Sequence, residues 1–179
     1  MARTDSLIRL AHEQDAAAIA QLSRDTIETG LGWTWRPQRV AASIRDPQSL
    51  CIVAGARPIL GFCITQFGEE IAHLSLLGVD PRHRRRGMGA RLVSWTVASA
   101  RVAGIAAIHV EMRANNSEAR CFYYSLGFEM GELVRGYYQG VESAQRMILR
   151  LRPEGLQQCV WEIPMSWRGP ARTSDDSGA

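Results

Sequence analysis

The sequence contains no lysine, and all 21 of its basic side chains are arginines. A phosphate loop of the Walker A type ends in Gly-Lys-Ser/Thr, so this absence excludes that class of nucleotide site. The four cysteines are few and show neither zinc-type nor redox-type spacing. We therefore expect no metal site, and we expect reduced core thiols at Cys51, Cys63 and Cys121, which have apolar neighbours.

Long apolar runs are also missing. No stretch has the length and apolarity of a membrane-spanning helix, and residues 1–6 lack the apolar run of a signal peptide. The net charge of +3 is modest and does not by itself indicate a nucleic-acid-binding protein. These absences predict a cytoplasmic protein with neither a membrane nor a nucleic acid as its partner. For the oligomeric state, monomer and homodimer both stay open.

The length of 179 residues favours one domain. We expect this domain to span residues 1–152, followed at 153–179 by an extension that is partly disordered and in which 161–167 adds a strand or packs as an arm. Apolar periodicity predicts an order of elements typical of a mixed α/β sheet with helices on both faces. The expected strands are 6–11, 50–54, 59–67, 72–79, 107–113, 128–134 and 145–151, and the expected helices are 16–27, 37–44, 90–104 and 118–126.

The chain is organised around a strongly basic turn, residues 79–90, between an apolar strand and a helix. Four arginines and one histidine lie between Arg82 and Arg86, and the pattern Arg84-x-x-Gly87-x-Gly89 places two glycines at the start of the helix. Glycine lets the backbone approach a ligand, and the free amides of a first helical turn bind anions. The turn therefore predicts a site for a polyanion such as a pyrophosphate, with a plain basic loop or a nucleic-acid patch as alternatives.

Two blocks of sequence carry a family resemblance. The pattern Arg84-x-x-Gly87-x-Gly89 after a strand ending in Val-x-Pro resembles the acetyl-CoA loop of the GNAT acetyltransferase superfamily. A second block is similar to the family pattern of Asn, Ala and Tyr-x-x-Leu-Gly-Phe, here Asn116, Ala119 and residues 123–128. The resemblance spans about residues 6–151. It implies the GNAT fold, a mixed, mostly antiparallel sheet of six to seven strands with helices on both faces, and it implies acetyl-CoA as the cofactor and an amine as the acceptor.

The resemblance also implies which residues bind the cofactor. Backbone amides at Leu77, Gly78 and Val79 would hold the acetyl-pantetheine arm. Asn116 would contact the cofactor, and Tyr123 would lie beside the sulfur and donate a proton to the leaving thiolate. Amides of the basic turn would take the pyrophosphate, namely those of Arg84, Arg85, Arg86, Gly87, Met88, Gly89 and Ala90. The structural alternative for Tyr123 is an aromatic ring that fills the core, and the neighbouring Tyr124 competes for the same role.

Acetyl transfer to an amine also needs a group that accepts the amine proton. Glu111 lies twelve residues before Tyr123, a spacing that resembles the RimI-type subgroup of the family. His73 lies on the strand that enters the basic turn, where histone-type members carry a glutamate, and could relay a proton through water. Glu111 is favoured and His73 is the alternative. The structural alternatives are an ion pair of Glu111 with Arg113 or Arg135 and a buried core histidine.

Three functions compete at the acceptor end. Arg135-x-Tyr137-Tyr138 resembles the RimI-type subgroup, which acetylates protein N-termini, and predicts contact with a peptide. Trp33 and Trp35, between glycines and a proline, either cover the core or close over a small-molecule amine. The third reading is a non-catalytic CoA-binding module or a nucleic-acid binder, against which the intact Asn116 and Tyr123 argue.

Overall fold

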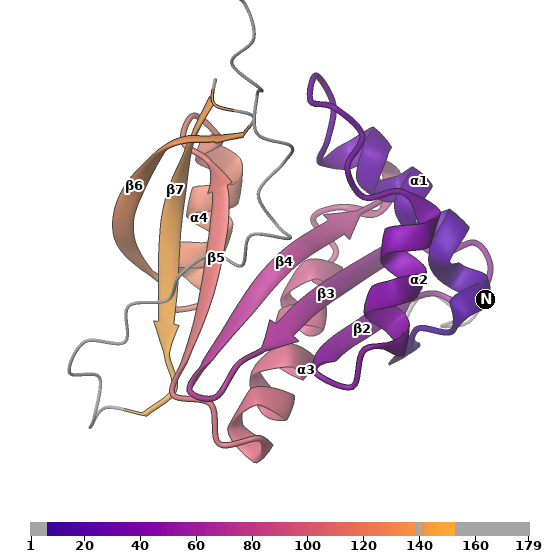
Figure 1. The fold of residues 1–179 in the computed structure, drawn as a ribbon, viewed down its shortest axis with the longest axis horizontal. Coiled ribbons are helices and arrows are strands. Elements are labelled where there is room, and N and C mark those ends of the chain that lie inside the picture. Colours follow the sequence, from indigo (N-terminus) through magenta and orange to yellow (C-terminus); the bar gives the residue numbers. More distant parts are fainter. Residues whose placement is uncertain (1–6, 139, 141, 153–179) are drawn as a thin grey trace, which may run out of the picture.

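The computed structural model describes residues 7–138, 140 and 142–152. The extension expected at 153–179, with its arm at 161–167, lies outside the described residues. The described chain forms a seven-stranded sheet in the order β1-β2-β3-β4-β5-β7-β6 (Figure 1). Strands β4 and β5 pair in parallel, and the other neighbours pair antiparallel. The expected mixed, mostly antiparallel sheet is confirmed.

The elements follow the apolar patterns of the sequence closely. The strands are β1 (Ile8–Leu10), β2 (Ser49–Ala54), β3 (Gly61–Phe67), β4 (Ile71–Val79), β5 (Ala107–Arg113), β6 (Glu129–Tyr138) and β7 (Glu142–Arg150). The helices are α1 (Ala16–Thr26), α2 (Pro37–Arg45), α3 (Met88–Val102) and α4 (Ser117–Ser125), with short 3-10 turns η2 (Glu13–Asp15) and η3 (Pro81–His83). One boundary differs from the expected one in a way that matters for the site. The expected strand 128–134 continues as β6 to Tyr138, so Tyr137 and Tyr138 lie in a strand and not in the turn that follows it.

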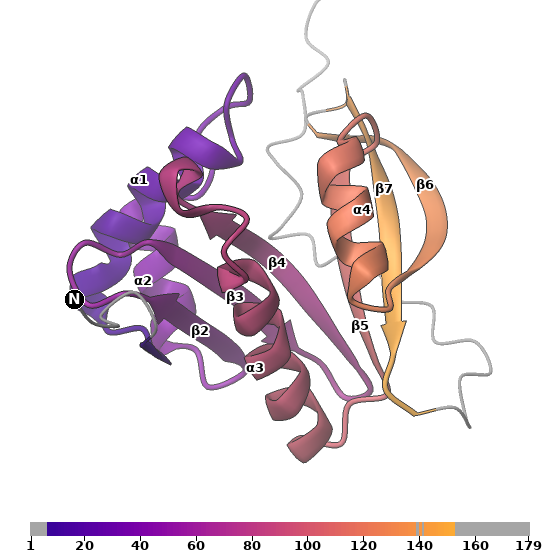
Figure 2. The same cartoon turned by 180° about the vertical axis from the view of Figure 1, so that it is seen from behind.

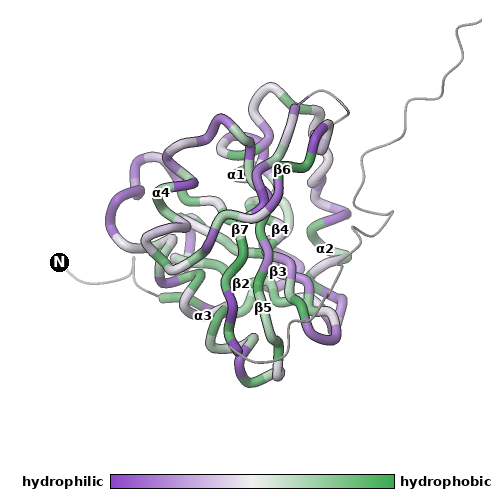
Figure 3. The backbone as a smooth tube through the Cα atoms, turned by 90° about the vertical axis from the view of Figure 1, so that its left-hand side faces the viewer, coloured by the Kyte–Doolittle hydropathy of each residue, from purple (hydrophilic) through white to green (hydrophobic). Residues whose placement is uncertain are grey.

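Helices cover both faces of the sheet, as the sequence predicts. On one face α1 and α2 pack against β2 to β4, with Ile19, Val40 and Phe62 in the shared core. On the other face α3 and α4 pack over a second core that contains Leu92 and Phe128 (Figures 1 and 2). Hydrophobic segments gather in the central strands, and the outer loops are mostly hydrophilic (Figure 3).

The sheet opens between its two central strands. The parallel pairing of β4 and β5 runs from Ile71 opposite Ala107 to Leu74 opposite Val110 and ends there. At this point the register of β4 against β3 shifts, because Thr65 faces Leu74 and Ile64 faces Leu76, so Ser75 is the extra residue of a bulge. Beyond the bulge the two strands diverge (Figure 1). A cleft can therefore form within the sheet itself, between the ends of β4 and β5.

Two further expectations can be compared with the structure. Cys51 and Cys63 are buried free thiols, but Cys121 is exposed, so the expectation of a core position is wrong for Cys121. The apolar neighbours of Cys121 face the core from other positions of α4. Within residues 7–138, 140 and 142–152, no helix has both the length and the apolarity needed to cross a membrane.

Candidate functional site

A cleft of about 1110 Å³ occupies the opening between β4 and β5. Its walls come from the segment between α1 and α2, the second half of β4, the basic turn, the starts of α3 and α4, the end of β5 and the end of β6. The fold thus brings both sequence blocks, which lie about thirty residues apart along the chain, onto the walls of one cavity.

The basic turn forms the end of this cleft nearest α3. Asp80 accepts a hydrogen bond from the backbone N–H of Arg82 at 2.9 Å and thereby fixes η3. The chain then passes through left-handed backbone at Arg85 (φ 60°) and Gly87 (φ 77°) before α3 begins at Met88. Of the seven residues expected to bind pyrophosphate, all but Arg86 line the cleft. The turn presents free helical amides and arginines to the same space, which is the requirement for binding a polyanion.

The two glycines of the turn, Gly87 and Gly89, are required for different structural reasons. Gly87 needs a positive φ, which side-chain-bearing residues adopt only at a cost. At Gly89, a Cβ atom would lie 3.2 Å from Cζ of Phe122, so glycine lets the first turn of α3 approach α4 closely. The second glycine therefore also joins the two helices that carry the two sequence blocks.

The end of β4 forms a second wall. Leu77, Gly78 and Val79 line the cleft and lie beyond Leu74, where the pairing with β5 ends. The edge of β4 that would otherwise bond to β5 can therefore offer its backbone groups to a ligand. This is the geometry that an extended, amide-containing arm needs in order to bind as an added strand.

Helix α4 presents the tyrosine of the second block. Asn116 caps this helix, because its Oδ1 accepts the backbone N–H of Ala119 at 3.0 Å. Tyr123 is buried on the cleft side, edge-to-face with Phe122 and Phe128 at centroid distances of 5.1 Å. Tyr124 is 45% exposed and is not among the cleft-lining residues, so the arrangement favours Tyr123. Burial raises the pKa of the Tyr123 hydroxyl well above its ordinary value, and the group therefore holds its proton.

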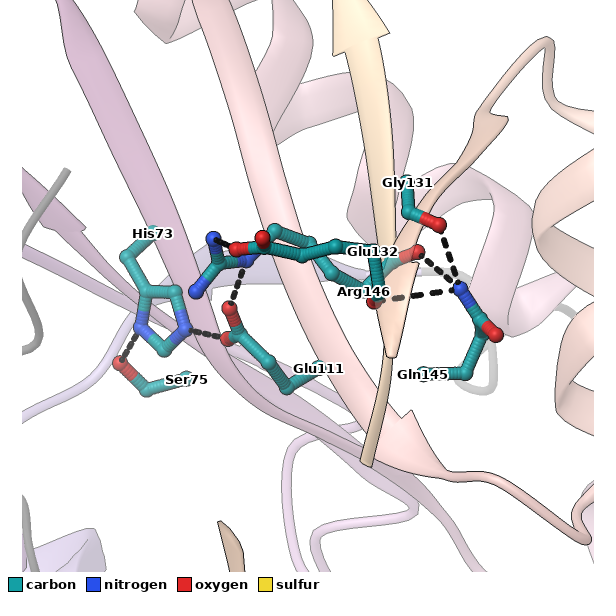
Figure 4. A network of polar contacts seen from close by, with 7 residues as sticks. All are labelled: His73, Ser75, Glu111, Gly131, Glu132, Gln145 and Arg146. Carbon is teal, nitrogen blue, oxygen red and sulfur yellow. Dashed lines mark hydrogen bonds and ion pairs between the residues drawn. The ribbon is translucent and has the colours of Figure 1, made fainter. Parts of the chain in front are cut away.

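The two candidate proton acceptors are hydrogen-bonded to each other. Nε2 of His73 contacts Oε2 of Glu111, and Nδ1 of His73 lies 3.2 Å from Oγ of Ser75 (Figure 4). His73 is 3% exposed, and the Glu111 side chain is 1% exposed. Burial opposes ionisation of Glu111, but the bonds from His73 and Arg146 outweigh it together and lower the pKa of the carboxyl. From sequence these two residues were alternatives, whereas the structure joins them by a hydrogen bond.

Arg146 is one of the site residues that the sequence did not indicate. Its Nε donates to Oε1 of Glu111 at 2.7 Å, and its Nη1 forms an ion pair with Glu132. Glu111 thus pairs with Arg146 and not with Arg113 or Arg135, the partners considered from sequence. Residues 111 and 146 are directly opposite in the β5–β7 register, and no local pattern predicts that pairing.

Aromatic side chains close the other end of the cleft. Trp35, Tyr137 and Tyr138 line it, and the two tyrosine rings meet edge-to-face at 4.9 Å. Burial, followed by the charge of Glu111, raises the pKa of both tyrosines above the ordinary range. Trp33 does not line the cleft and packs instead against the α1–α2 side of the core, with Arg24 over its ring. Trp33 therefore covers the core and Trp35 lines the cleft, so each tryptophan takes one of the two positions expected from sequence.

A buried carboxylate holds the segment that carries Trp35. Glu28 is 6% exposed and accepts hydrogen bonds from the backbone N–H of Thr34 at 2.6 Å and from its hydroxyl at 2.9 Å. Ser23 donates to the same carboxylate at 3.1 Å, and Arg39 stacks on Trp35 at 4.1 Å. The sequence showed the turn but not this anchor, since Glu28 belongs to no motif.

The cleft thus combines an anion-binding end, an unpaired strand edge, a protonated tyrosine and a buried carboxylate–imidazole pair. This set can bind a phosphorylated thioester, donate a proton to a leaving group and accept one from a nucleophile. Among the residues that the structure describes, no group of histidine, cysteine, aspartate and glutamate side chains is arranged to hold a metal ion.

Known proteins resemble this chain in sequence. Residues 47–130 match the model of the acetyltransferase (GNAT) domain. The chain is 33% identical over 92 residues to the [ribosomal protein bS18]-alanine N-acetyltransferase of Escherichia coli K12, an alignment that covers 51% of this chain and 62% of that protein. The alignment therefore spans less than two thirds of the length of this curated relative.

Solved structures extend the similarity over more of the fold. The crystal structure of the Escherichia coli ribosomal-protein-S18-alanine N-acetyltransferase superposes with a TM-score of 0.71 at 26% identity, covering 85% of this chain and 97% of that one. YncA of Salmonella typhimurium, solved with its cofactor acetyl-CoA, superposes with a TM-score of 0.69 at 20% identity, covering 86% and 98%. The second likeness concerns the fold alone. In its matched domain, in its fold and in the two sequence blocks that line one cleft, the chain is therefore similar to the GNAT acetyltransferases.

Proposed function

We propose that this protein transfers the acetyl group of acetyl-CoA to a primary amine by direct attack, and that the amine is the N-terminus of a protein or peptide. The observation that carries the proposal is the meeting, in one cleft, of the basic turn, the unpaired end of β4, Tyr123 and the His73–Glu111 pair. The Escherichia coli relatives, which are named as alanine N-acetyltransferases of a ribosomal protein, support the choice of acceptor.

Each step of the reaction has a group in this chain. The amine nitrogen attacks the thioester carbonyl carbon and the C–S bond breaks. The thiolate departs, and the acetyl group remains bonded to the nitrogen. Tyr123 gives its proton to the departing sulfur, which is consistent with a hydroxyl that stays protonated. The proton lost by the amine passes to the His73–Glu111 pair. Amides of residues 77–79 would bind the pantetheine arm, and the basic turn with Asn116 would bind the phosphates.

The aromatic end supports a peptide acceptor. Tyr137 and Tyr138 are rigid, partly buried rings beside Glu111, and such rings contact an extended chain with little loss of conformational entropy. A small-molecule amine is the second candidate. Trp35 supports this candidate. Arg39 and the segment anchored by Glu28 hold Trp35 at the cleft wall, which leaves a compact space for the acceptor.

A thiol-release screen with acetyl-CoA tests the proposal and separates these acceptors. We expect short N-terminal peptides to be acetylated faster than polyamines, amino acids or aminoglycosides. Tyr138→Ala should raise the peptide KM by about tenfold, the loss of about 1.4 kcal/mol of contact, and leave the acetyl-CoA KM unchanged. Trp33→Ala is the matched aromatic control, since Trp33 lies outside the cleft. A preference for polyamines, with sensitivity at Trp35 and indifference at Tyr138, would replace the peptide by a small amine.

Cofactor binding is tested separately by thermal denaturation and calorimetry. Acetyl-CoA should raise the melting temperature by linkage, whereas ATP and NAD should not. Arg85→Ala should weaken acetyl-CoA binding in a salt-dependent way, since the exposed guanidinium lies on the cleft wall. Arg101→Ala, on the exposed last turn of α3, is the control that should bind normally. Absence of any acetyl-CoA binding by the unaltered protein would end the proposal.

A further inference from the structure

We infer that the proton acceptor of this site is a hydrogen-bonded chain, Ser75–His73–Glu111, in which Ser75 meets the amine, His73 takes the proton and Arg146 holds Glu111 as a fixed anion. This inference rests on the proposed function and assigns roles within the same cleft. Ser75 and Arg146 belong to neither sequence block. Ser75, His73, Glu111 and Arg146 come from three strands, β4, β5 and β7 (Figure 4).

The first step of the argument is that Glu111 is badly placed to meet an amine itself. Its side chain is 1% exposed, and each carboxylate oxygen already accepts a charged or polar donor, Oε1 from Arg146 at 2.7 Å and Oε2 from His73. Because the side chain is almost fully buried and each oxygen already has a donor, little of the carboxylate is open to an amine. A carboxylate bound in this way orients and stabilises its partner instead of exchanging protons with substrate.

The second step concerns the tautomer of His73. An ionised carboxylate can only accept, so the Nε2 that contacts Glu111 must carry a hydrogen. In the neutral ring Nδ1 is then an acceptor, and the group 3.2 Å away is the hydroxyl of Ser75. Ser75 therefore donates to His73, and the chain points in one direction, from Ser75 through the imidazole to the carboxylate.

The third step is access. His73 is 3% exposed, whereas Ser75 is only half-buried and lines the cleft. Ser75 is also the bulge residue of β4, located where the strand leaves β5 and the cleft begins. The bulge therefore places a hydroxyl between the cleft and a buried imidazole. Bulges next to active sites commonly aim a side chain in this way.

The titratable and charged groups around His73 leave Glu111 as the anion beside the imidazole, which favours proton transfer from Ser75 to His73. Strand β5 contributes Glu111 and also His109, whose pKa burial lowers to about 4, with a further contribution from Arg146, so that His109 stays neutral. Strand β7 contributes Arg146, whose second partner is Glu132 of β6. Tyr137 of β6 and Arg39 of α2 line the same cleft, and the tyrosine stays protonated. Glu111 is thus the anion in hydrogen-bond contact with the imidazole.

The proton balance is simple. As the amine nitrogen bonds to the acetyl carbon, its N–H proton passes to Oγ of Ser75 while the Ser75 hydroxyl proton passes to Nδ1 of His73. The imidazolium keeps its Nε2–H on Glu111 and later returns the proton to solvent. Ser75 is neither consumed nor acylated, and no further reactant is needed.

Replacement of Ser75 tests the chain directly. Ser75→Ala should lower kcat about 10²-fold, in the range lost with a general base, and leave acetyl-CoA binding and Tm unchanged. Ser75→Thr restores a hydroxyl at a strand position and should recover most of the rate. Wild-type kcat in Ser75→Ala would overturn the inference, and so would an acetyl group found on Ser75 by intact-mass analysis, because the hydroxyl would then be a nucleophile. Failure of the unaltered protein to acetylate any amine would instead remove the proposed function.

The positioning role of Arg146 predicts a pH signature that packing alone would not give. In Arg146→Met the charge of Glu111 acts on His73 without compensation, so the proton is held more tightly and the acidic limb of kcat/KM moves to higher pH. In Glu111→Gln the anion is lost, and the limb should move to lower pH as kcat falls. Shifts of the same sign, or none, would contradict the assignment. Arg146→Lys keeps the charge and should stay close to the unaltered profile.

A measurement without turnover covers the case in which Arg146→Met does not fold. Nitrogen-15 NMR of the histidines in the unaltered protein should show His73 as the Nε2–H tautomer at neutral pH. Ser75→Ala should change the nitrogen-15 chemical shift of His73 Nδ1, because that nitrogen loses its hydrogen-bond donor. An Nδ1–H tautomer in the unaltered protein would reverse the direction of the chain and overturn the inference.

Discussion

Arg113 and Thr29 are joined across the mouth of the cleft. Nη2 of Arg113, the last residue of β5, donates to the carbonyl oxygen of Thr29 at 2.6 Å. The same nitrogen lies 3.4 Å from the carbonyl oxygen of Ile27, and Nη1 lies 3.7 Å from Glu142 of β7. Since β4 and β5 have no mutual pairing at this depth, one side chain connects the two halves of the opened sheet.

Removal of this connection should loosen the α1–α2 segment. In Arg113→Met we expect faster hydrogen exchange over residues 27–35 and an acceptor KM raised by about tenfold, because a hydrogen bond from a charged donor contributes about 1.5–3 kcal/mol. The acetyl-CoA KM should hardly change. Arg101→Ala serves as the control for loss of an arginine. Unchanged exchange in this segment would show that Glu28 alone is sufficient to hold it.

Loss of the α4 cap separates a structural role of Asn116 from cofactor contact. Asn116→Ala should destabilise the protein by about 1 kcal/mol, since the N–H of Ala119 loses its acceptor. Asn116→Asp keeps an acceptor and should retain stability in urea unfolding. If Asn116 also meets the cofactor, the new negative charge should weaken acetyl-CoA binding in calorimetry. Normal binding by both variants would restrict Asn116 to capping.

The contact between Gly89 and Phe122 predicts a rescue. Gly89→Ala places a methyl group 3.2 Å from Cζ of the phenylalanine ring and should cost about 1–3 kcal/mol of stability through overpacking. In the Phe122→Leu background the same change should cost clearly less. A double-mutant cycle from chemical unfolding measures this coupling. Additive effects would mean that Gly89 is needed for another reason, such as close approach of the ligand.

The buried tyrosines should make the protein sensitive to alkali. Burial raises the pKa of Tyr123, Tyr137 and Tyr138 in the folded state above the ordinary value of about 10. The unfolded chain therefore releases these protons first, so the stability that they contribute is fully present below about pH 10 and is lost as the pH rises further. Urea unfolding measured from about pH 8 to about pH 11, a range that brackets the ordinary tyrosine pKa, should show the decline. Tyr137→Phe should make it shallower, and an unchanged slope would contradict the assignment.

Local sequence determined most of the fold. The capping pattern at residues 115–117 predicted α4, the run 107–113 predicted β5, and Pro37 marked the first residue of α2. These signals depend on apolar periodicity and on backbone chemistry within a few residues, and they act before the chain has folded. The two sequence blocks indicated the resemblance to the superfamily for the same reason, because each is a short stretch with its own backbone geometry.

The chemistry within the cleft was decided by tertiary structure. From sequence, Glu111 and His73 were rival bases, yet the parallel pairing of β4 and β5 makes them partners. Arg146 meets Glu111 because residues 111 and 146 are opposite in the β5–β7 register. A shift of one residue in that register would turn the arginine to the other face of the sheet, although the sequence would be the same. Contacts between strands depend on which residues the whole fold places opposite one another, and for that reason only the folded chain could show that His73, Glu111 and Arg146 form one network.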